Sequence, residues 1–138
     1  RFAIIRLAEL YLNYAEALNE AEGPTAEVYN AVNKIRRRAQ LLDLPANLTK
    51  DEMRNKIRQE RRVELAFENH RFWDVRRWKI AEIVDNKKVH KITVNADGTY
   101  SYPVFQNRVF DKAKHYLFPI PQSEIDKNRN LVQNPGWN

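Results

Sequence analysis

Apolar residues recur every three or four positions through the first forty residues, a spacing that predicts amphipathic helices. Between residues 4 and 22 the expected buried stripe consists of Leu7, Leu10, Tyr11, Tyr14, Ala15 and Leu18. Gly23-Pro24 ends this helix, and Thr25 can cap a second one. Its expected buried side consists of Val28, Ala31, Val32, Ile35 and Ala39. Because so short a turn makes the two helices antiparallel, residues 4–40 are predicted to form a helical hairpin.

The spacing within this hairpin is similar to that of one tetratricopeptide repeat, with Leu7, Ala8 and Tyr11 followed by Ala15 and Leu18. No second copy is found in the sequence. Such repeats bury their faces against neighbours, so either an upstream part of the same protein or the third helix is expected to cover this one. The chain begins at Arg1 without a methionine or a signal-peptide pattern, and we interpret it as a fragment of a longer protein.

Two further helices are predicted in residues 49–84. Thr49 followed by Glu52 has the form of a capping box, so the third helix is expected to start there. Its apolar positions carry it to Phe67 or Glu68, and Asn69, which tolerates left-handed geometry, is expected to stop it. A fourth helix is predicted from Arg71 to about residue 84.

The apolar period changes to two after residue 88, which indicates strands. Residues 88–106 are predicted to form a β-hairpin around the turn at 95–98, supported by the helices because a two-stranded hairpin alone is marginally stable. Residues 110–138 are rich in proline and are expected to form an extended tail over the core, with one short turn at 123–127. The prediction is a single, mainly α domain over residues 1–138: a tetratricopeptide-like helical hairpin, further helices, one β-hairpin and an extended proline-containing C-terminal segment.

Composition excludes several kinds of site. The chain has no cysteine, its three histidines stand far apart, and its three glycines form no phosphate-binding loop. We therefore expect no metal and no cofactor. The net charge of +6 comes from 24 basic and 18 acidic residues, and the basic runs at 36–38 and 76–77 are expected to be solvated or paired with carboxylates. A nucleic-acid partner is not expected.

Residues 60–78 carry the densest mixture of charges and aromatics. Three carboxylates at successive helical turns, Glu60, Glu64 and Glu68, could in principle supply an acid and a base. Neighbouring arginines would instead lower the carboxylate pKa values, whereas a general acid needs a raised pKa. We expect a structural ion-pair and aromatic network, with Phe67, Phe72, Trp73 and Trp78 in the core rather than forming a ligand platform. The network consists of Glu60, Arg61, Arg62, Glu64, Glu68, Arg71, Asp74, Arg77 and Trp78.

Tyr100 and Tyr102 are the residues proposed to contact a ligand. They alternate along one strand of the predicted hairpin and could stack against the flat apolar face of a sugar ring. The role we expect first for these two rings is packing onto the helices, and stacking against a sugar is the candidate ligand contact.

Five segments in order resemble the C-terminal part of the RagB/SusD family. They are RLAELYLNYAEAL at 6–18, NKIRRRA at 33–39, ERRVELAFENHRFWDVRRW at 60–78, YLFPIPQ at 116–122 and NPG at 134–136. The resemblance extends over nearly the whole chain. Asn69 stands where family members commonly have glycine, and both residues suit a helix end.

The resemblance implies a non-enzymatic glycan-binding lipoprotein of the outer membrane in Bacteroidetes-type bacteria. It implies exposure at the cell surface, an anchor at a lipid-modified cysteine upstream, and a TonB-dependent outer-membrane transporter and an oligosaccharide as partners. The part in hand would mainly be scaffold and partner surface, and the matching motifs are scaffold motifs that carry over no binding residue. The alternative is a stand-alone tetratricopeptide-like module that binds a protein partner.

Overall fold

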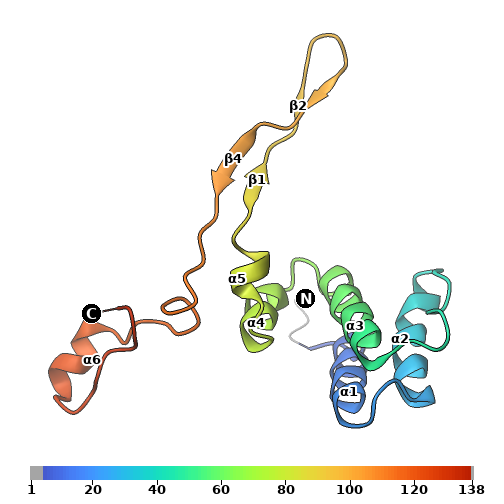
Figure 1. The fold of residues 1–138 in the computed structure, drawn as a ribbon, viewed down its shortest axis with the longest axis horizontal. Coiled ribbons are helices and arrows are strands. Elements are labelled where there is room, and N and C mark those ends of the chain that lie inside the picture. Colours follow the sequence, from blue (N-terminus) through green and yellow to red (C-terminus); the bar gives the residue numbers. More distant parts are fainter. Residues whose placement is uncertain (1–4, 138) are drawn as a thin grey trace. The chain divides into compact units, whose positions relative to one another are not determined.

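A computed structural model describes residues 5–137, which divide into two compact units, one ending at Arg71 and the other starting at Phe72. The described chain contains helices α1 to α6 and strands β1 to β4 (Figure 1). The mainly helical fold with one β-hairpin confirms the predicted fold class.

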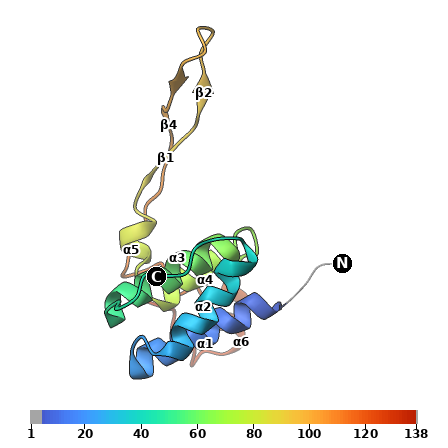
Figure 2. The ribbon, with the colours of Figure 1, turned by 90° about the vertical axis from the view of Figure 1, so that its right-hand side faces the viewer.

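The first unit consists of α1 (Leu7–Glu22), α2 (Ala26–Arg38) and α3 (Lys50–Glu64), which lie side by side in both views (Figures 1 and 2). The hairpin turn is the one predicted: Gly23 has a φ of 89° and its N–H donates to the carbonyl of Asn19 over 3.0 Å. Thr25 is the N-cap of α2, although its hydroxyl makes no capping hydrogen bond. The capping box of Thr49 and Glu52 is complete.

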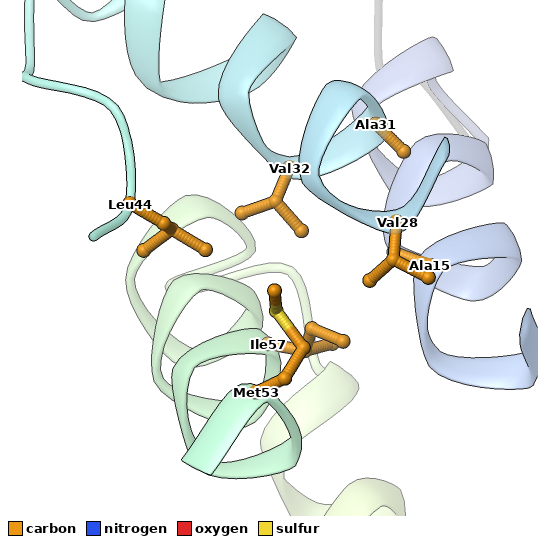
Figure 3. Close-up of a cluster of buried hydrophobic side chains, with 7 residues drawn as sticks. All are labelled: Ala15, Val28, Ala31, Val32, Leu44, Met53 and Ile57. Carbon is orange, nitrogen blue, oxygen red and sulfur yellow. The ribbon is translucent and has the colours of Figure 1, made fainter. Parts of the chain in front are cut away.

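The third helix, α3, packs against the hairpin and completes the core of this unit. This is one of the two ways in which we expected the hairpin to be covered. Met53 and Ile57 of α3 pack against side chains of both hairpin helices (Figure 3). The whole cluster consists of Ala15, Val28, Ala31, Val32, Leu44, Met53 and Ile57, and a smaller one joins Leu12, Ile35 and Leu65. The buried Asn33 accepts a hydrogen bond from the backbone N–H of Leu44 over 2.9 Å, which holds the connector between α2 and α3.

The predicted buried stripe of α1 is only partly correct. Leu7, Leu10 and Tyr14 are half or more exposed, whereas Leu12 and Asn19 are fully buried. The apolar surface of α1 is wider than the side that α2 and α3 cover, and periodicity does not distinguish the covered part. Ala39 is also exposed rather than buried, because α2 ends at Arg38 and the chain turns at Gln40 with a φ of 57°.

Two predicted helix boundaries are wrong. Helix α3 ends at Glu64, and Phe67, which we expected in the core, has a φ of 64° and a fully exposed side chain. The predicted fourth helix is two helices, α4 (His70–Arg77) and α5 (Ala81–Val84). They are separated by a Schellman turn in which Lys79, with a φ of 53°, donates to the carbonyl of Arg76 and Ile80 donates to that of Val75.

The predicted hairpin is interrupted. Strand β1 (Lys88–His90) pairs antiparallel with β4 (Val104–Asn107), and β2 (Thr93–Val94) pairs with β3 (Tyr100–Ser101) nearer the turn (Figure 1). Pro103 lies between the two ladders and has no N–H to donate, although its carbonyl accepts from Lys91. The turn closes with Gly98, whose φ is 80°.

The proline-containing tail packs on α4 and α5 of the second unit. Phe110 and Tyr116 join Val75 and Ala81 in its core, and Phe118 stacks on Phe72 with 5.9 Å between ring centroids. Phe72 and Trp73 nevertheless remain 41% and 58% exposed, so the prediction that they are core residues is wrong for this chain. The short turn expected at 123–127 is helix α6 (Gln122–Lys127).

The end of the tail is held where Gly136 meets Lys114. A Cβ at Gly136 would lie 2.9 Å from the Cβ of Lys114, and both Gly136 and Gly98 have a φ near 80°, but nothing surrounds Gly98. We expect Gly98→Ala to cost about 1 kcal/mol from backbone strain alone. Gly136→Ala should cost about 1 kcal/mol more from the steric clash. Urea unfolding of the two variants measures the difference; equal losses would show that the clash is relieved without cost.

Candidate functional site

The three carboxylates that suggested catalysis are bound to arginines of α2 and to Arg6, the residue before α1. Glu64 accepts hydrogen bonds from Arg6 and, over 2.7 Å to each oxygen, from Nη2 of Arg38. Glu60 accepts from Nη1 of Arg36 over 2.8 Å, and Glu68 accepts from Nε of Arg6 over 2.8 Å. The side chains of Glu60 and Glu64 are only 10% exposed.

The pairing of Glu68 with Arg6 favours the ionised form of this carboxylate. The hydrogen bonds from Arg6 hold the pKa of Glu68 below its ordinary value, and nearby charges of Arg6 and His70 act in the same direction. A carboxylate with a lowered pKa does not hold a proton at neutral pH and cannot donate one as a general acid. The geometry is that of an ion-pair network between helices.

The remaining predicted network residues are distributed around these carboxylates and over α4. Arg61 is buried and donates to Oδ1 of Asn13 over 2.6 Å, whereas Arg62 is exposed and has no ion pair within residues 5–137. Arg71 is the last residue of the first unit. In the second unit the buried Asp74 accepts from Nε of Arg77 over 3.0 Å, and the guanidinium of Arg77 lies 4.8 Å from the centroid of the Trp78 ring.

His70 also contacts residues of the first unit, although it was not among the residues predicted for the ion-pair network. Its Nε2 lies 3.7 Å from Oε2 of Glu9, and its Nδ1 lies 3.4 Å from Nη2 of Arg61. Among residues 5–137 no three histidine, aspartate or glutamate side chains gather in a way that could hold a metal ion.

Tyr100 and Tyr102 are exposed on the hairpin. Their side chains are 61% and 62% exposed, and neither ring contacts another aromatic ring in the described part of the chain. This exposure does not support the expected packing of the two rings onto the helices of the same unit. Tyr100 lies on β3 and Tyr102 directly follows that strand, so the two rings stand two positions apart on the hairpin. Their backbone is held by a hydrogen bond of 2.7 Å between Nδ1 of His90 and the carbonyl of Tyr102.

An apolar cleft lies on the outer side of the first helical hairpin. Its volume is about 220 Å³, and its walls come from α1, α2 and the residue before α1. The lining residues are Arg6, Leu7, Ala8, Tyr11, Lys34, Ile35 and Arg38. Two of them, Arg6 and Arg38, hold Glu64, so the ion-pair network forms one edge of the cleft.

No helix within residues 5–137 combines the length and the apolar character required to cross a membrane.

Comparison with known proteins gives consistent matches over nearly the whole chain. SusD-like protein P2 of Formosa agariphila is 36% identical over 96% of this chain, which spans 25% of that relative. The structure of a SusD-like protein from Bacteroides fragilis superimposes with a TM-score of 0.88 at 38% identity, covering 97% of this chain and 25% of that one.

A SusD-like carbohydrate binding protein from Bacteroides vulgatus shares the fold, with a TM-score of 0.65 at 24% identity over 95% of this chain and 30% of that one. The chain thus spans about a quarter of the length of the relatives it matches. Residues 1–137 match the SusD family (SusD_RagB). The chain belongs to the SusD family.

Proposed function

We propose that this chain is part of a non-enzymatic glycan-binding protein that works at the outer membrane. Membership of the SusD family supports this proposal, and a fold neighbour is described as carbohydrate binding. The ion-pair network supports the absence of catalysis, since its carboxylates are engaged by arginines.

The observation that carries the binding proposal is the exposure of Tyr100 and Tyr102, two positions apart on the hairpin. Aromatic rings present a flat apolar surface with a polar hydroxyl, which suits the C–H face and hydroxyl groups of a sugar. We infer that the two rings stack against successive parts of an oligosaccharide.

The family resemblance also suggests how the bound glycan is used. The protein would be attached to the outer surface of the outer membrane by a lipid-modified cysteine of the whole protein and would pass the glycan to a TonB-dependent transporter. The exposed residues Leu7, Leu10 and Tyr14 would then pack against other parts of the whole protein, which in the relatives is about four times as long as this chain. Coimmunoprecipitation of the whole protein with the transporter tests this arrangement.

A stand-alone interaction module is the second candidate. The apolar cleft on the helical hairpin favours it, because a groove lined by Leu7, Tyr11 and Ile35 could receive a partner helix. A protein partner that binds residues 1–138 as tightly as it binds the whole protein would support this alternative.

Replacing both tyrosines should separate binding from stability. We expect the Tyr100→Ala, Tyr102→Ala double variant of the whole protein to bind its best oligosaccharide at least about tenfold more weakly. The midpoint of thermal unfolding should stay unchanged because both rings are exposed. Calorimetric titration against a glycan panel measures the affinity.

Two matched variants make this test specific. Tyr100→Phe with Tyr102→Phe keeps both rings and should retain most of the affinity, whereas Val94→Ala alters an equally exposed side chain of the same hairpin and should have no effect. Full affinity in the double alanine variant would remove the tyrosines from the site. A whole protein that binds no glycan, or that hydrolyses one steadily, would contradict the proposed function.

A further inference from the structure

A second cleft, of about 330 Å³, lies in the second unit, where the end of β4 passes α4 and α5. It is lined by Phe72 and Arg76 of α4, by Asp85 after α5, and by residues 106–110. The lining is mixed in character: two guanidinium groups, one carboxylate and two side-chain amides stand beside apolar groups. Such a set can recognise a polar ligand through several directional hydrogen bonds.

Arg76 differs in its surroundings from six arginines of the chain that form ion pairs. The guanidiniums of Arg6, Arg36, Arg37, Arg38, Arg54 and Arg77 each donate to a carboxylate. That of Arg76 lies on the Phe72 ring, 3.5 Å from the centroid, and 5.3 Å from the Phe110 centroid. Its one hydrogen bond is from Nη1 to the carbonyl of Phe72 over 3.0 Å, and no carboxylate accepts from it within residues 5–137.

Burial makes this guanidinium unusually dependent on a partner. Its Nε is buried without a hydrogen-bond partner, and removal from water holds the pKa of Arg76 below its ordinary value, while Asp85 acts in the opposite direction. The desolvated cation is thus only partly compensated by the protein. An anionic group entering the cleft would complete the compensation.

Arg108 supplies a second cation to the same cleft. Its side chain is exposed and has no partner in the described part of the chain, although its backbone N–H donates to the carbonyl of Lys87 over 3.2 Å. With Asp85 included, the charged groups that line the cleft sum to one net positive charge. The cleft therefore favours a ligand that combines one negative charge with neutral polar groups.

The position of these groups is fixed by Asn86. Its Oδ1 accepts from the N–H of Phe110, and its Nδ2 donates to the carbonyls of Phe110 and Glu82 over 3.0 and 2.8 Å. Through these hydrogen bonds Asn86 holds the backbone of Phe110 next to α5. The Phe72 ring contacts both the guanidinium of Arg76 and the ring of Phe118, so it helps to hold Arg76 in place.

We propose that this cleft binds an acidic sugar unit, whose carboxylate or sulfate group pairs with the guanidiniums of Arg76 and Arg108. Hydroxyl groups of the same sugar would donate to Asp85 and bond to the amides of Gln106 and Asn107. The inference rests on the proposed glycan-binding function and specifies the charge of the glycan. It adds a site of charge recognition to the stacking surface of Tyr100 and Tyr102.

The test compares charged and neutral forms of the same oligosaccharides. The whole protein is titrated calorimetrically with oligogalacturonides and their methyl esters, and with a sulfated galactan oligosaccharide and its desulfated form. We expect at least one charged form to bind about tenfold more tightly than its neutral counterpart, with an affinity that falls as salt rises. The pair that shows the preference identifies the anion as a carboxylate or a sulfate.

Three variants distinguish recognition of the ligand's charge from an effect on protein stability and from an effect of the protein's net charge. Arg108→Gln should lower the affinity for the charged form by about tenfold and leave both the neutral form and the unfolding midpoint unaffected. Arg76→Lys keeps the charge but loses the planar fork and should show the same selective loss. Lys112→Gln removes an exposed charge outside the cleft and should have no such effect.

Each other outcome overturns the proposal in a recognisable way. Equal affinity for charged and neutral forms, or equal losses in Arg108→Gln and Lys112→Gln, would reject the acidic-sugar site while leaving glycan binding in place. Absence of binding to all forms, and to a broad panel of neutral glycans, would reject the proposed function as well.

Discussion

Replacement of Ile57 by alanine should lower the free energy of unfolding of this chain by about 2–5 kcal/mol. Ile57 is 1% exposed and belongs to the cluster that joins α3 to both hairpin helices. Removing three carbons there takes away apolar burial and leaves a cavity between helices that are held apart by their other contacts. The loss is large because Ile57 of α3 belongs to the same cluster as side chains of α1 and α2, so one substitution weakens the contacts of all three helices.

Urea unfolding followed by helical circular dichroism measures this loss. For a slope of about 1–3 kcal/mol per molar urea, the expected change moves the transition midpoint by roughly 1 M or more. Val63→Ala is the matched control, because Val63 lies on the same helix and is 61% exposed. It should change the stability by no more than about 0.5 kcal/mol. Equal effects of the two substitutions would mean that α3 does not pack through Ile57.

Local signals predicted the starts and turns of the helices well. The capping box of Thr49 and Glu52 and the turn at Gly23 depend on residues within a few positions of each other, so they can be recognised in the sequence. Asn69 does adopt the left-handed conformation expected of it, with a φ of 64°, but α3 ends earlier, at Glu64. Lys79 gives no such signal, and the α4–α5 break there was not expected.

Contacts between distant segments were the part that the sequence could not specify. Glu64 was expected to pair with arginines of its own segment, but the partners that hold it, Arg6 and Arg38, lie on other elements, 58 and 26 positions away. The acidic-sugar cleft was missed for the same reason. Arg76 and Arg108 are brought together by the return of β4 past α4, and in sequence both resemble ordinary surface arginines.

The exposed aromatic side chains show a different limit of predicting burial from the sequence. Burial was expected for Phe67 and Trp73 because large aromatic side chains usually lie in cores, yet they are 105% and 58% exposed. For Phe67 the reason is local, since the helix ends before it. For Trp73, which lies on α4 next to the buried Asp74 and Val75, the exposed face is available for parts of the whole protein outside this chain.

The second large effect is expected at Glu64. Glu64→Gln should lower the free energy of unfolding by about 2–3 kcal/mol, because the neutral amide cannot accept charge-assisted hydrogen bonds from two arginines at once. The Glu64 side chain is only 10% exposed, so water can replace few of the hydrogen bonds that the substitution removes. Urea unfolding at neutral pH measures the change.

Glu68→Gln is the matched control for this variant. Glu68 shares Arg6 as a partner, but it is 33% exposed, so solvent screening should reduce the loss to about 1 kcal/mol or less. A double-mutant cycle of Glu64→Gln with Arg38→Gln should show a coupling of about 0.5–1 kcal/mol, since Arg38 is 61% exposed and most of the energy lies with Arg6.

Ligand binding distinguishes a structural Glu64 from a functional one. If the network from Glu60 to Trp78 only holds helices together, the folded Glu64→Gln variant of the whole protein should bind glycan with unchanged affinity. A selective loss of affinity at full stability would place Glu64 in a binding site, together with the apolar cleft whose edge its partners Arg6 and Arg38 form. The two measurements on one substitution therefore decide whether the most charged segment of the chain serves the fold or the ligand.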